Sequence, residues 1–140
     1  RHSHLDNAGY SLDQKADKKY TPETMAQALY EEEKIRCVLN SLVICLFARK
    51  IYDLETTARC LNIIGHDHTA LSLAQLGDEI FNAKIAVKKR LGFDFSQIRL
   101  PSRFFETPTP HGQLQEEVAL ETIRHYETLV EGGLDSLRKS

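Results

Sequence analysis

The feature that most constrains the fold is an apolar run between two arginines. Residues 36–49 read Arg-Cys-Val-Leu-Asn-Ser-Leu-Val-Ile-Cys-Leu-Phe-Ala-Arg, with twelve residues between the arginines. A bilayer-spanning helix needs about 20 apolar residues, so this run is too short to cross a membrane. We therefore predict that it forms a core helix around which the other segments pack. Cys45 lies inside the run, and Asn40 and Ser41 precede it by about one helical turn.

Composition limits the class of protein. A chain of 140 residues is long enough for one domain with a hydrophobic core. The net charge of −2 disfavours nucleic acid and membrane surfaces as partners. Seven glycines and four prolines fit a helical domain better than an all-β one. Cys37, Cys45 and Cys60 cannot all pair within the chain. With no secretory signal, they indicate a reducing compartment, and we expect the cytoplasm.

The amino-terminal part differs from the rest of the chain. Residues 1–20 are polar and lack periodicity, so they are predicted to be a loop. The chain begins at Arg1 and its only methionine is Met25, so we expect a piece of a longer protein. Residues 1–20 would continue from a missing upstream domain, and residues 21–140 would form a helical domain. His2 and His4 could be metal ligands, but a solvated terminus is favoured.

The first helix is predicted to begin at Thr21-Pro22, where a capping hydroxyl precedes proline at the first helical position. It continues to about residue 50 or breaks near Asn40 and Ser41, whose side chains compete for backbone partners. Apolar residues recur at spacings of three and four. They are Met25, Ala28, Leu29, Ile35, Val38, Leu39, Leu42 and Leu46. The charged residues between them are predicted to form a solvated face. These are Glu31, Glu32, Glu33, Lys34 and Arg36.

Three further segments complete the predicted fold. A helix at residues 54–64 is capped by Asp53 and ended by Gly65, and a long helix covers residues 70–91 and stops at Gly92. The apolar side of the long helix comprises Leu71, Leu73, Leu76, Ile80, Phe81, Ile85, Val87 and Leu91. A last helix at residues 114–130, with Val118, Ile123, Tyr126, Leu129 and Val130 inward, is expected to end at Gly132-Gly133.

Residues 93–112 contain three prolines and cannot form a continuous helix. Their apolar content is too high for a free linker: Phe93, Phe95, Leu100, Phe104 and Phe105. We predict an ordered strap that lies across the helices. The predicted fold is all-α, an orthogonal or irregular bundle of about four or five helices with this proline-rich strap.

The residues alone assign no chemistry. His66 and His68 flank Asp67, but neither histidine has a partner at helical spacing, and a helix cap is needed there. The spacing of the three cysteines matches no self-contained zinc or ferredoxin pattern, so each is first read as a small buried hydrophobe. No nucleophile signature surrounds them.

Three segments in order resemble the C-terminal region of the tungsten-dependent aldehyde ferredoxin oxidoreductases. They read Leu76-Gly-Asp-Glu-Ile-Phe-Asn82, Lys89-Arg-Leu-Gly-Phe93 and Leu100-Pro-Ser-Arg-Phe104. The family has a Gly-Glu-Arg-Ile-aromatic-Asn helix, an Arg-Glu-Gly-Phe end and a Leu-Pro-x-Arg strap in the same order. The loop from Gly65 to Thr69 resembles the family's loop before that helix. The similarity covers most of residues 21–130.

The family's motif Asp-x-x-Gly-Leu-Cys resembles Asn40-Ser-Leu-Val-Ile-Cys45. The resemblance implies that Cys45 is the fourth thiolate of a [4Fe–4S] cluster, with three others from an upstream Cys-x-x-Cys-x-x-x-Cys segment. Asn40 replaces the aspartate that touches the pterin, Val43 replaces the glycine, and Ile44 matches the leucine. His4 resembles an active-site histidine that would donate a hydrogen bond or shuttle a proton.

The resemblance implies part of a tungsten or molybdenum bis-pterin enzyme that oxidises small aldehydes to carboxylic acids and passes electrons to ferredoxin. Alone, the chain is expected to be inactive and to bind no cofactor, since upstream domains supply the rest. Two alternatives stay open: a related aryl-CoA reductase-type subunit, and a helical protein-interaction module without a redox site.

Overall fold

The described part of the chain is helical. The computed structural model describes residues 12, 20–48, 51–108 and 112–139. Its elements, in order, are α2 (Pro22–Ser41), η2 (Leu46–Ala48), α3 (Leu54–Ile63), α4 (Ala70–Arg90), η3 (Phe95–Gln97), α5 (Arg103–Glu106) and α6 (Glu116–Lys139). No β-strand occurs within these residues. The predicted all-α class is therefore confirmed.

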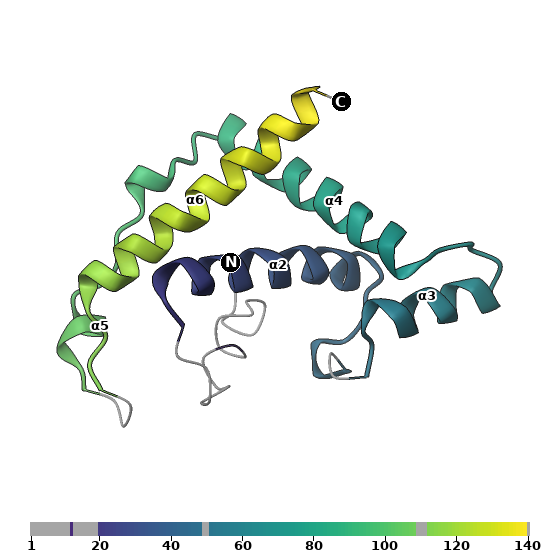
Figure 1. Cartoon of the computed structure of the whole chain (residues 1–140), viewed down its shortest axis with the longest axis horizontal. Helices are drawn as coiled ribbons and strands as arrows, with labels where there is room; N and C mark the ends of the chain where they lie inside the picture. The colour runs from purple at the N-terminus through teal and green to yellow at the C-terminus, as the bar shows by residue number, and fades with distance from the viewer. Residues whose placement is uncertain (1–11, 13–19, 49–50, 109–111, 140) are drawn as a thin grey trace.

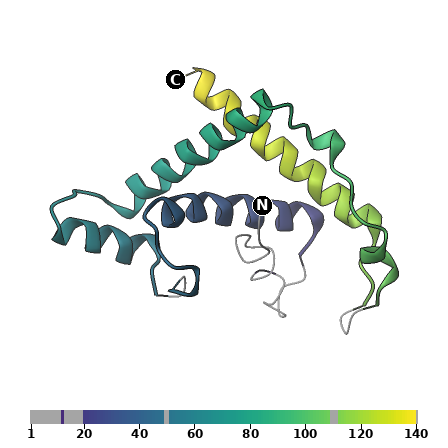
Figure 2. The same ribbon diagram turned by 180° about the vertical axis from the view of Figure 1, so that it is seen from behind.

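The three long helices lie like the sides of a triangle (Figures 1 and 2). Helix α2 packs against both α4 and α6, and α4 also meets α6 near the end of each helix. Helix α3 packs against α4. The first part of the strap leaves the end of α4 and runs back along α6 to α5 (Figure 1). Most of the chain is thus organised around α2, which has neighbours on two sides.

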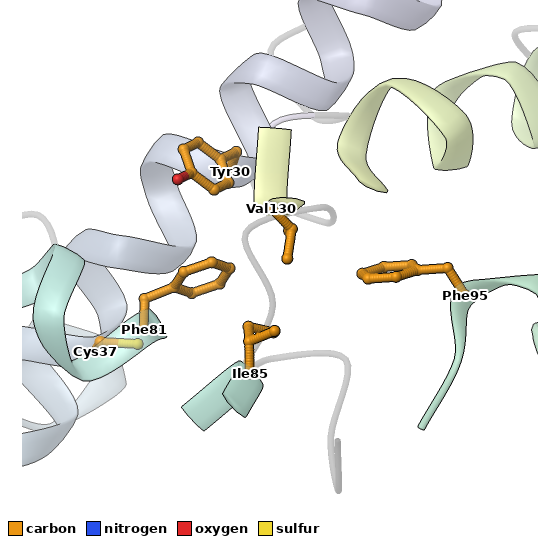
Figure 3. Close-up of a cluster of buried hydrophobic side chains, with 6 residues drawn as sticks. All are labelled: Tyr30, Cys37, Phe81, Ile85, Phe95 and Val130. Atoms are coloured by element: carbon orange, nitrogen blue, oxygen red, sulfur yellow. The ribbon is translucent and has the colours of Figure 1, made fainter. Parts of the chain in front are cut away.

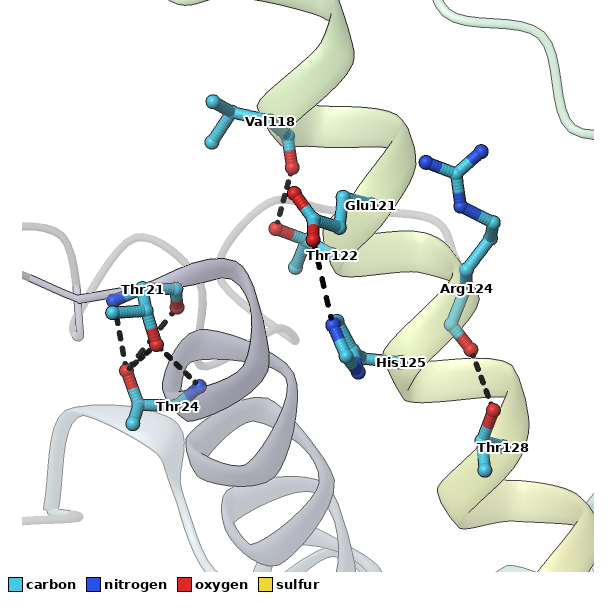
Figure 4. A network of polar contacts seen from close by, with 8 residues as sticks. All are labelled: Thr21, Thr24, Val118, Glu121, Thr122, Arg124, His125 and Thr128. Atoms are coloured by element: carbon cyan, nitrogen blue, oxygen red, sulfur yellow. Dashed lines mark hydrogen bonds and ion pairs between the residues drawn. The ribbon is translucent and has the colours of Figure 1, made fainter.

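Short polar side chains fix where the helices begin. The backbone N–H of Thr24 donates to Oγ1 of Thr21 at 3.2 Å, and the N–H of Thr21 donates back to Oγ1 of Thr24 at 2.9 Å (Figure 4). Thr69 and Ser72 form the same reciprocal cap at the start of α4. Asp53 accepts from the N–H of Thr56 at the start of α3. These caps satisfy backbone donors that have no partner within the helix, and the predicted starts are confirmed.

The core is a cluster to which each long helix and the strap contribute (Figure 3). Its buried members are Tyr30, Cys37, Phe81, Ile85, Phe95 and Val130. The rings of Tyr30 and Phe81 meet edge to face with centroids 5.3 Å apart. A second cluster of Val38, Ala58 and Leu73 joins α2, α3 and α4.

The strap packs against the helices over its first part. Phe95 is 8% exposed, and Phe93 and Ile98 pack against the main cluster. Phe104, however, is 51% exposed, so the expectation that all the strap's aromatic residues are covered is wrong. The reason is that the chain turns into the four-residue helix α5, which has no buried residue.

The apolar run at residues 36–49 is not one core helix. Helix α2 ends at Ser41, the second of the two predicted alternatives, and the Ser41 hydroxyl donates to the carbonyl of Cys37. Cys37, Val38 and Leu39 are buried, as predicted. Beyond the helix end, Val43 is 89% and Phe47 is 79% exposed. Once the helix ends, its periodicity no longer directs side chains into the core.

The charged face predicted for α2 is also partly wrong. Glu33 and Arg36 are buried at 7% and 6% exposure. Because α4 and α6 cover α2 from two sides, the buried arc is wider than one apolar stripe. Both charges have partners: Glu33 is paired with Lys84, and Arg36 donates two hydrogen bonds to Glu32. Buried charges are tolerated when they are paired in this way.

Several predictions for the later helices need correction. Leu71, Leu76 and Val87 of α4 are exposed, and so is Leu91, which follows the end of that helix. Leu71 lies two residues before Leu73, the first buried residue of α4, and Val87 lies two residues after Ile85, the last one. Two residues correspond to a rotation of about 200° around the helix, so both side chains point away from the buried face. In α6, Val118 is 42% exposed, so the prediction that it points inward is wrong. Helix α6 also does not end at Gly132-Gly133 but continues to Lys139. A helix held by tertiary packing absorbs a glycine's cost of about 1 kcal/mol.

Candidate functional site

The segment that resembles the cluster motif forms the turn after α2. The N–H of Val43 donates to the carbonyl of Asn40 at 3.0 Å, and the N–H of Ile44 donates to the carbonyl of Leu39 at 2.9 Å. This pair of bonds is the Schellman motif, which satisfies carbonyls at the end of a helix. The turn brings the chain out of α2 and places Cys45 on a short surface segment.

Val43 has an unusual backbone in this turn. Its φ is +57°, in the left-handed region that costs an L residue roughly 1–2 kcal/mol. Helices α3 and α4 end with the same pair of bonds, but there the equivalent residues are Gly65 at φ +91° and Gly92 at φ +85°. The motif that this segment resembles also has glycine at this position. The turn therefore keeps the shape that glycine favours, although valine now occupies it.

The three motif residues differ in exposure. Asn40 is exposed near the end of α2, Ile44 is partly buried, and Cys45 is exposed. The carbonyl of Cys45 accepts from the N–H of Ala48, which closes the short helix η2. Of the other cysteines, Cys37 is buried and Cys60 is exposed. The predicted reading of all three as buried hydrophobes thus holds for Cys37 alone.

Exposed apolar side chains lie near Cys45 in the sequence. Leu42, Val43, Phe47 and Ile51 are all exposed, and we call them with Cys45 the Cys45 surface. Large apolar side chains gathered on a surface mark sites of contact with another protein surface or a ligand. Cys45 therefore lies on an exposed segment of the chain whose neighbouring apolar side chains are also exposed.

Two other parts of the sequence contain candidate metal ligands, namely His4 and the loop from Gly65 to Thr69. His4 lies outside the described residues. In the loop from Gly65 to Thr69, the backbone N–H of His68 donates to Oδ1 of Asn62 at 2.7 Å, and Nδ2 of Asn62 donates to the carbonyl of His68. Thr69 caps α4. Over the described ranges, no group of three or more His, Cys, Asp or Glu side chains could hold a metal ion. These contacts fit the interpretation that the loop serves to cap a helix.

A buried polar network links the three long helices, and sequence reasoning missed it. Glu33 on α2 accepts a hydrogen bond from Nζ of Lys84 on α4 at 2.7 Å and another from the hydroxyl of Tyr126 on α6. The same ammonium lies 3.8 Å from the sulfur of Cys37. The signal was the spacing of Ala26, Tyr30, Glu33 and Cys37, which places Glu33 on a buried face.

A second network lies at the crossing of α2 and α4. Nζ of Lys34 is 2.9 Å from Asp78 and 3.1 Å from Glu31, and it lies over the ring of Tyr30. Burial alone would lower the pKa of Lys34, but the hydrogen bonds that its ammonium donates to Asp78 and Glu31, with the attraction of the two carboxylate charges, outweigh burial and raise that pKa. Burial also raises the pKa of Tyr30. Both residues are therefore held protonated.

Comparison with known families settles the relationship of the chain. The family model for aldehyde ferredoxin oxidoreductase, domains 2 and 3, matches residues 2–131. The chain belongs to the aldehyde ferredoxin oxidoreductase family. No curated protein and no solved structure gave a match. Within the described residues, no helix has the length and apolar character needed to cross a membrane.

The residues present fit the role of one ligand in a shared cluster. A [4Fe–4S] cluster is held by four thiolates. The described cysteines do not come together as a group, so a cluster held by this chain would take its other ligands from elsewhere in an aldehyde ferredoxin oxidoreductase. Cys45 has the accessibility that such sharing requires, because its side chain is exposed. Cys37 is buried and so lacks that accessibility.

Proposed function

We propose that this chain is part of an enzyme that oxidises aldehydes to carboxylic acids, with Cys45 as one ligand of a [4Fe–4S] cluster. The observation that carries the proposal is the exposed thiol of Cys45, directly after a helix end whose backbone has the glycine-type shape of the family motif. Family membership supports an oxidoreductase parent.

The proposed reaction joins an aldehyde and water to give a carboxylic acid, two protons and two electrons. The formyl C–H bond breaks and a C–O bond forms. When bound, a tungsten or molybdenum bis-pterin supplies the two-electron redox chemistry, and the cluster carries single electrons onward to ferredoxin. This chain's own residues act by holding and orienting these groups.

We assign the remaining motif residues to positioning. Asn40 is exposed beside the turn, and its amide can both donate and accept hydrogen bonds, as a pterin contact requires. Ile44 is partly buried and fixes the turn between Asn40 and Cys45. His4 is proposed to donate a hydrogen bond to substrate or to shuttle a proton.

The Cys45 surface is proposed to be covered by the family's first domain. The matching family model describes domains 2 and 3, which leaves a first domain to supply the other thiolates and the pterin site. Covering Leu42, Val43, Phe47 and Ile51 would remove their side chains from water. Burial of such side chains is worth about 25 cal/mol per Å² of apolar area.

The test is substitution of each cysteine in the full-length parent. Cys45→Ser should lower iron content or change the electron paramagnetic resonance signal, because a serine oxygen is a hard, poor substitute for thiolate. Cys60→Ser is the matched control, since Cys60 is equally an exposed thiol but lies outside the motif. Cys37→Ser controls for a buried position. If all three variants keep full iron and the same signal, the assignment of Cys45 is wrong.

A further inference from the structure

A cavity that is partly open to solvent and separate from the Cys45 surface lies between α2, α4, the strap and α6. Its volume is about 250 Å³. Its apolar wall consists of Leu29, Ile85, Phe93, Phe95, Ile98 and Ile123. Leu29 precedes the last residue of α2 by twelve positions, which is roughly 18 Å of helix. The cavity is therefore far from the turn that carries Cys45.

The size and lining of the cavity suit one aromatic ring. An apolar cavity of about 150 Å³ lined by leucine, isoleucine and phenylalanine is known to bind benzene. The present cavity is larger and has the same kind of wall, with the rings of Phe93 and Phe95 packed edge to face at 5.0 Å. It therefore has room for a ring with a small substituent.

The polar groups of the wall determine what that substituent should be. The hydroxyl of Tyr126 donates to Glu33. The hydroxyl of Thr122 donates to the carbonyl of Val118 at 2.8 Å, as Figure 4 shows. With these protons used, both hydroxyl oxygens act toward a ligand only as acceptors. A ligand that meets them must carry a hydrogen-bond donor.

The charges around the cavity favour a neutral ligand. The carboxylate of Glu33 is buried and already paired with the ammonium of Lys84. A second ammonium, that of Lys88, lies 5.5 Å from the centroid of the Phe93 ring. A cationic ligand would lie near the ammonium of Lys88, and an anionic ligand would lie near the buried carboxylate of Glu33, so a ligand of either charge would meet a group of its own sign.

From these features we propose that the cavity binds a small neutral aromatic molecule with a hydroxyl or N–H donor, of the size of phenol. The ring lies among Phe93, Phe95 and Ile123, and the donor meets the oxygen of Thr122 or Tyr126. The site is independent of the proposed cluster, so its test needs neither iron nor the pterin.

The test is a titration of the full 140-residue chain, labelled with ¹⁵N, with phenol and separately with toluene. We expect saturable amide shifts concentrated at Phe93, Ile98 and Ile123. Phenol should bind up to about tenfold more tightly than toluene, because only phenol makes the hydrogen bond. Equal affinities, shifts centred on the Cys45 surface, or no saturable binding would overturn the proposal.

Substitutions in the cavity wall test where the ligand binds. Thr122→Val removes the acceptor at nearly constant size, so it should weaken phenol binding by a few-fold and leave toluene binding unchanged. Ile98→Trp fills the cavity and should abolish binding of both probes. Leu120→Trp is the control, because Leu120 is an exposed residue of α6 that does not line the cavity. If Ile98→Trp unfolds the chain, the comparison of the two probes and the Thr122→Val variant still decide. Loss of binding in Leu120→Trp, or equal losses for both probes in Thr122→Val, would contradict the assigned site.

Discussion

Nζ of Lys84 on α4 lies 2.7 Å from Oε1 of Glu33 on α2, although the two residues are 51 positions apart in the chain. Tyr126 on α6 donates to the other oxygen of the same carboxylate. One buried carboxylate thus connects all three long helices, at a position where the sequence pattern predicts a solvated charge.

Glu33→Gln should therefore destabilise the fold. We expect a loss of about 1–3 kcal/mol in the free energy of unfolding, at the lower end because the Lys84 side chain is 37% exposed and solvent weakens the ion pair. Urea unfolding gives the value. Glu31→Gln is the matched control, since Glu31 also pairs with a lysine but is half exposed, and it should change stability by less than about 0.5 kcal/mol. Equal effects of the two variants would show that burial of Glu33 contributes nothing.

Val43→Gly should stabilise the protein. The left-handed backbone at φ +57° costs valine roughly 1–2 kcal/mol, which glycine avoids, and the exposed valine side chain has little packing to lose. Greater freedom of glycine in the unfolded chain offsets part of this gain, so the expected net effect is about 0.5–1 kcal/mol. Gly65→Ala and Gly92→Ala, at the equivalent positions of α3 and α4, should destabilise. A loss of stability in Val43→Gly, measured by thermal unfolding, would contradict the strained backbone.

Two glycine-to-alanine changes should have opposite signs. A Cβ atom at Gly77 would lie 2.8 Å from the backbone oxygen of Lys34, so alanine must push α4 away from α2. We expect Gly77→Ala to cost about 1–3 kcal/mol, despite alanine's better helix propensity. A Cβ atom at Gly132 meets nothing within 4 Å, so Gly132→Ala should stabilise α6 by up to about 1 kcal/mol. Chemical unfolding of both variants tests the helix crossing, and a neutral or stabilising Gly77→Ala would argue against it.

Two phenylalanines of the strap should respond differently to truncation. Phe95→Ala removes a ring from the main cluster and should cost about 3–5 kcal/mol. Phe104→Ala removes a half-exposed ring and should cost well under half as much. Unfolding midpoints of the two variants give the comparison. Similar small losses would mean that the first part of the strap is not held against the helices.

Alkaline pH should weaken the crossing of α2 and α4. The folded-state pKa values of Lys34 and Tyr30 are both raised, so their contribution is fully present below the unfolded values. Those values are about 10.4 for lysine and 10 for tyrosine, and the contribution is lost as pH rises through the folded pKa values. The free energy of unfolding should therefore fall above about pH 10, and less steeply in Tyr30→Phe. A pH-independent free energy over this range would refute the prediction.

The sequence determined the helices and most of their ends. Thr21, Asp53 and Thr69 act as caps through side chains that reach only a few residues along the chain. Gly65 and Gly92 end helices because their own backbones adopt positive φ. These interactions are local, so they can be recognised without knowing what packs where. The family resemblance was also visible in the sequence, because it rests on the order of short motifs, and the family match confirms it.

Only the tertiary structure decided which faces are covered. Glu33 is buried because two helices from distant parts of the chain meet α2 there, and no local pattern contains that information. Gly132-Gly133 does not end α6, since packing holds the helix through both residues. Phe47 and Val43 stay exposed because the chain offers no neighbour to cover them in the described residues. Burial depends on contacts between distant residues, whereas helix formation and capping depend on residues only a few positions apart.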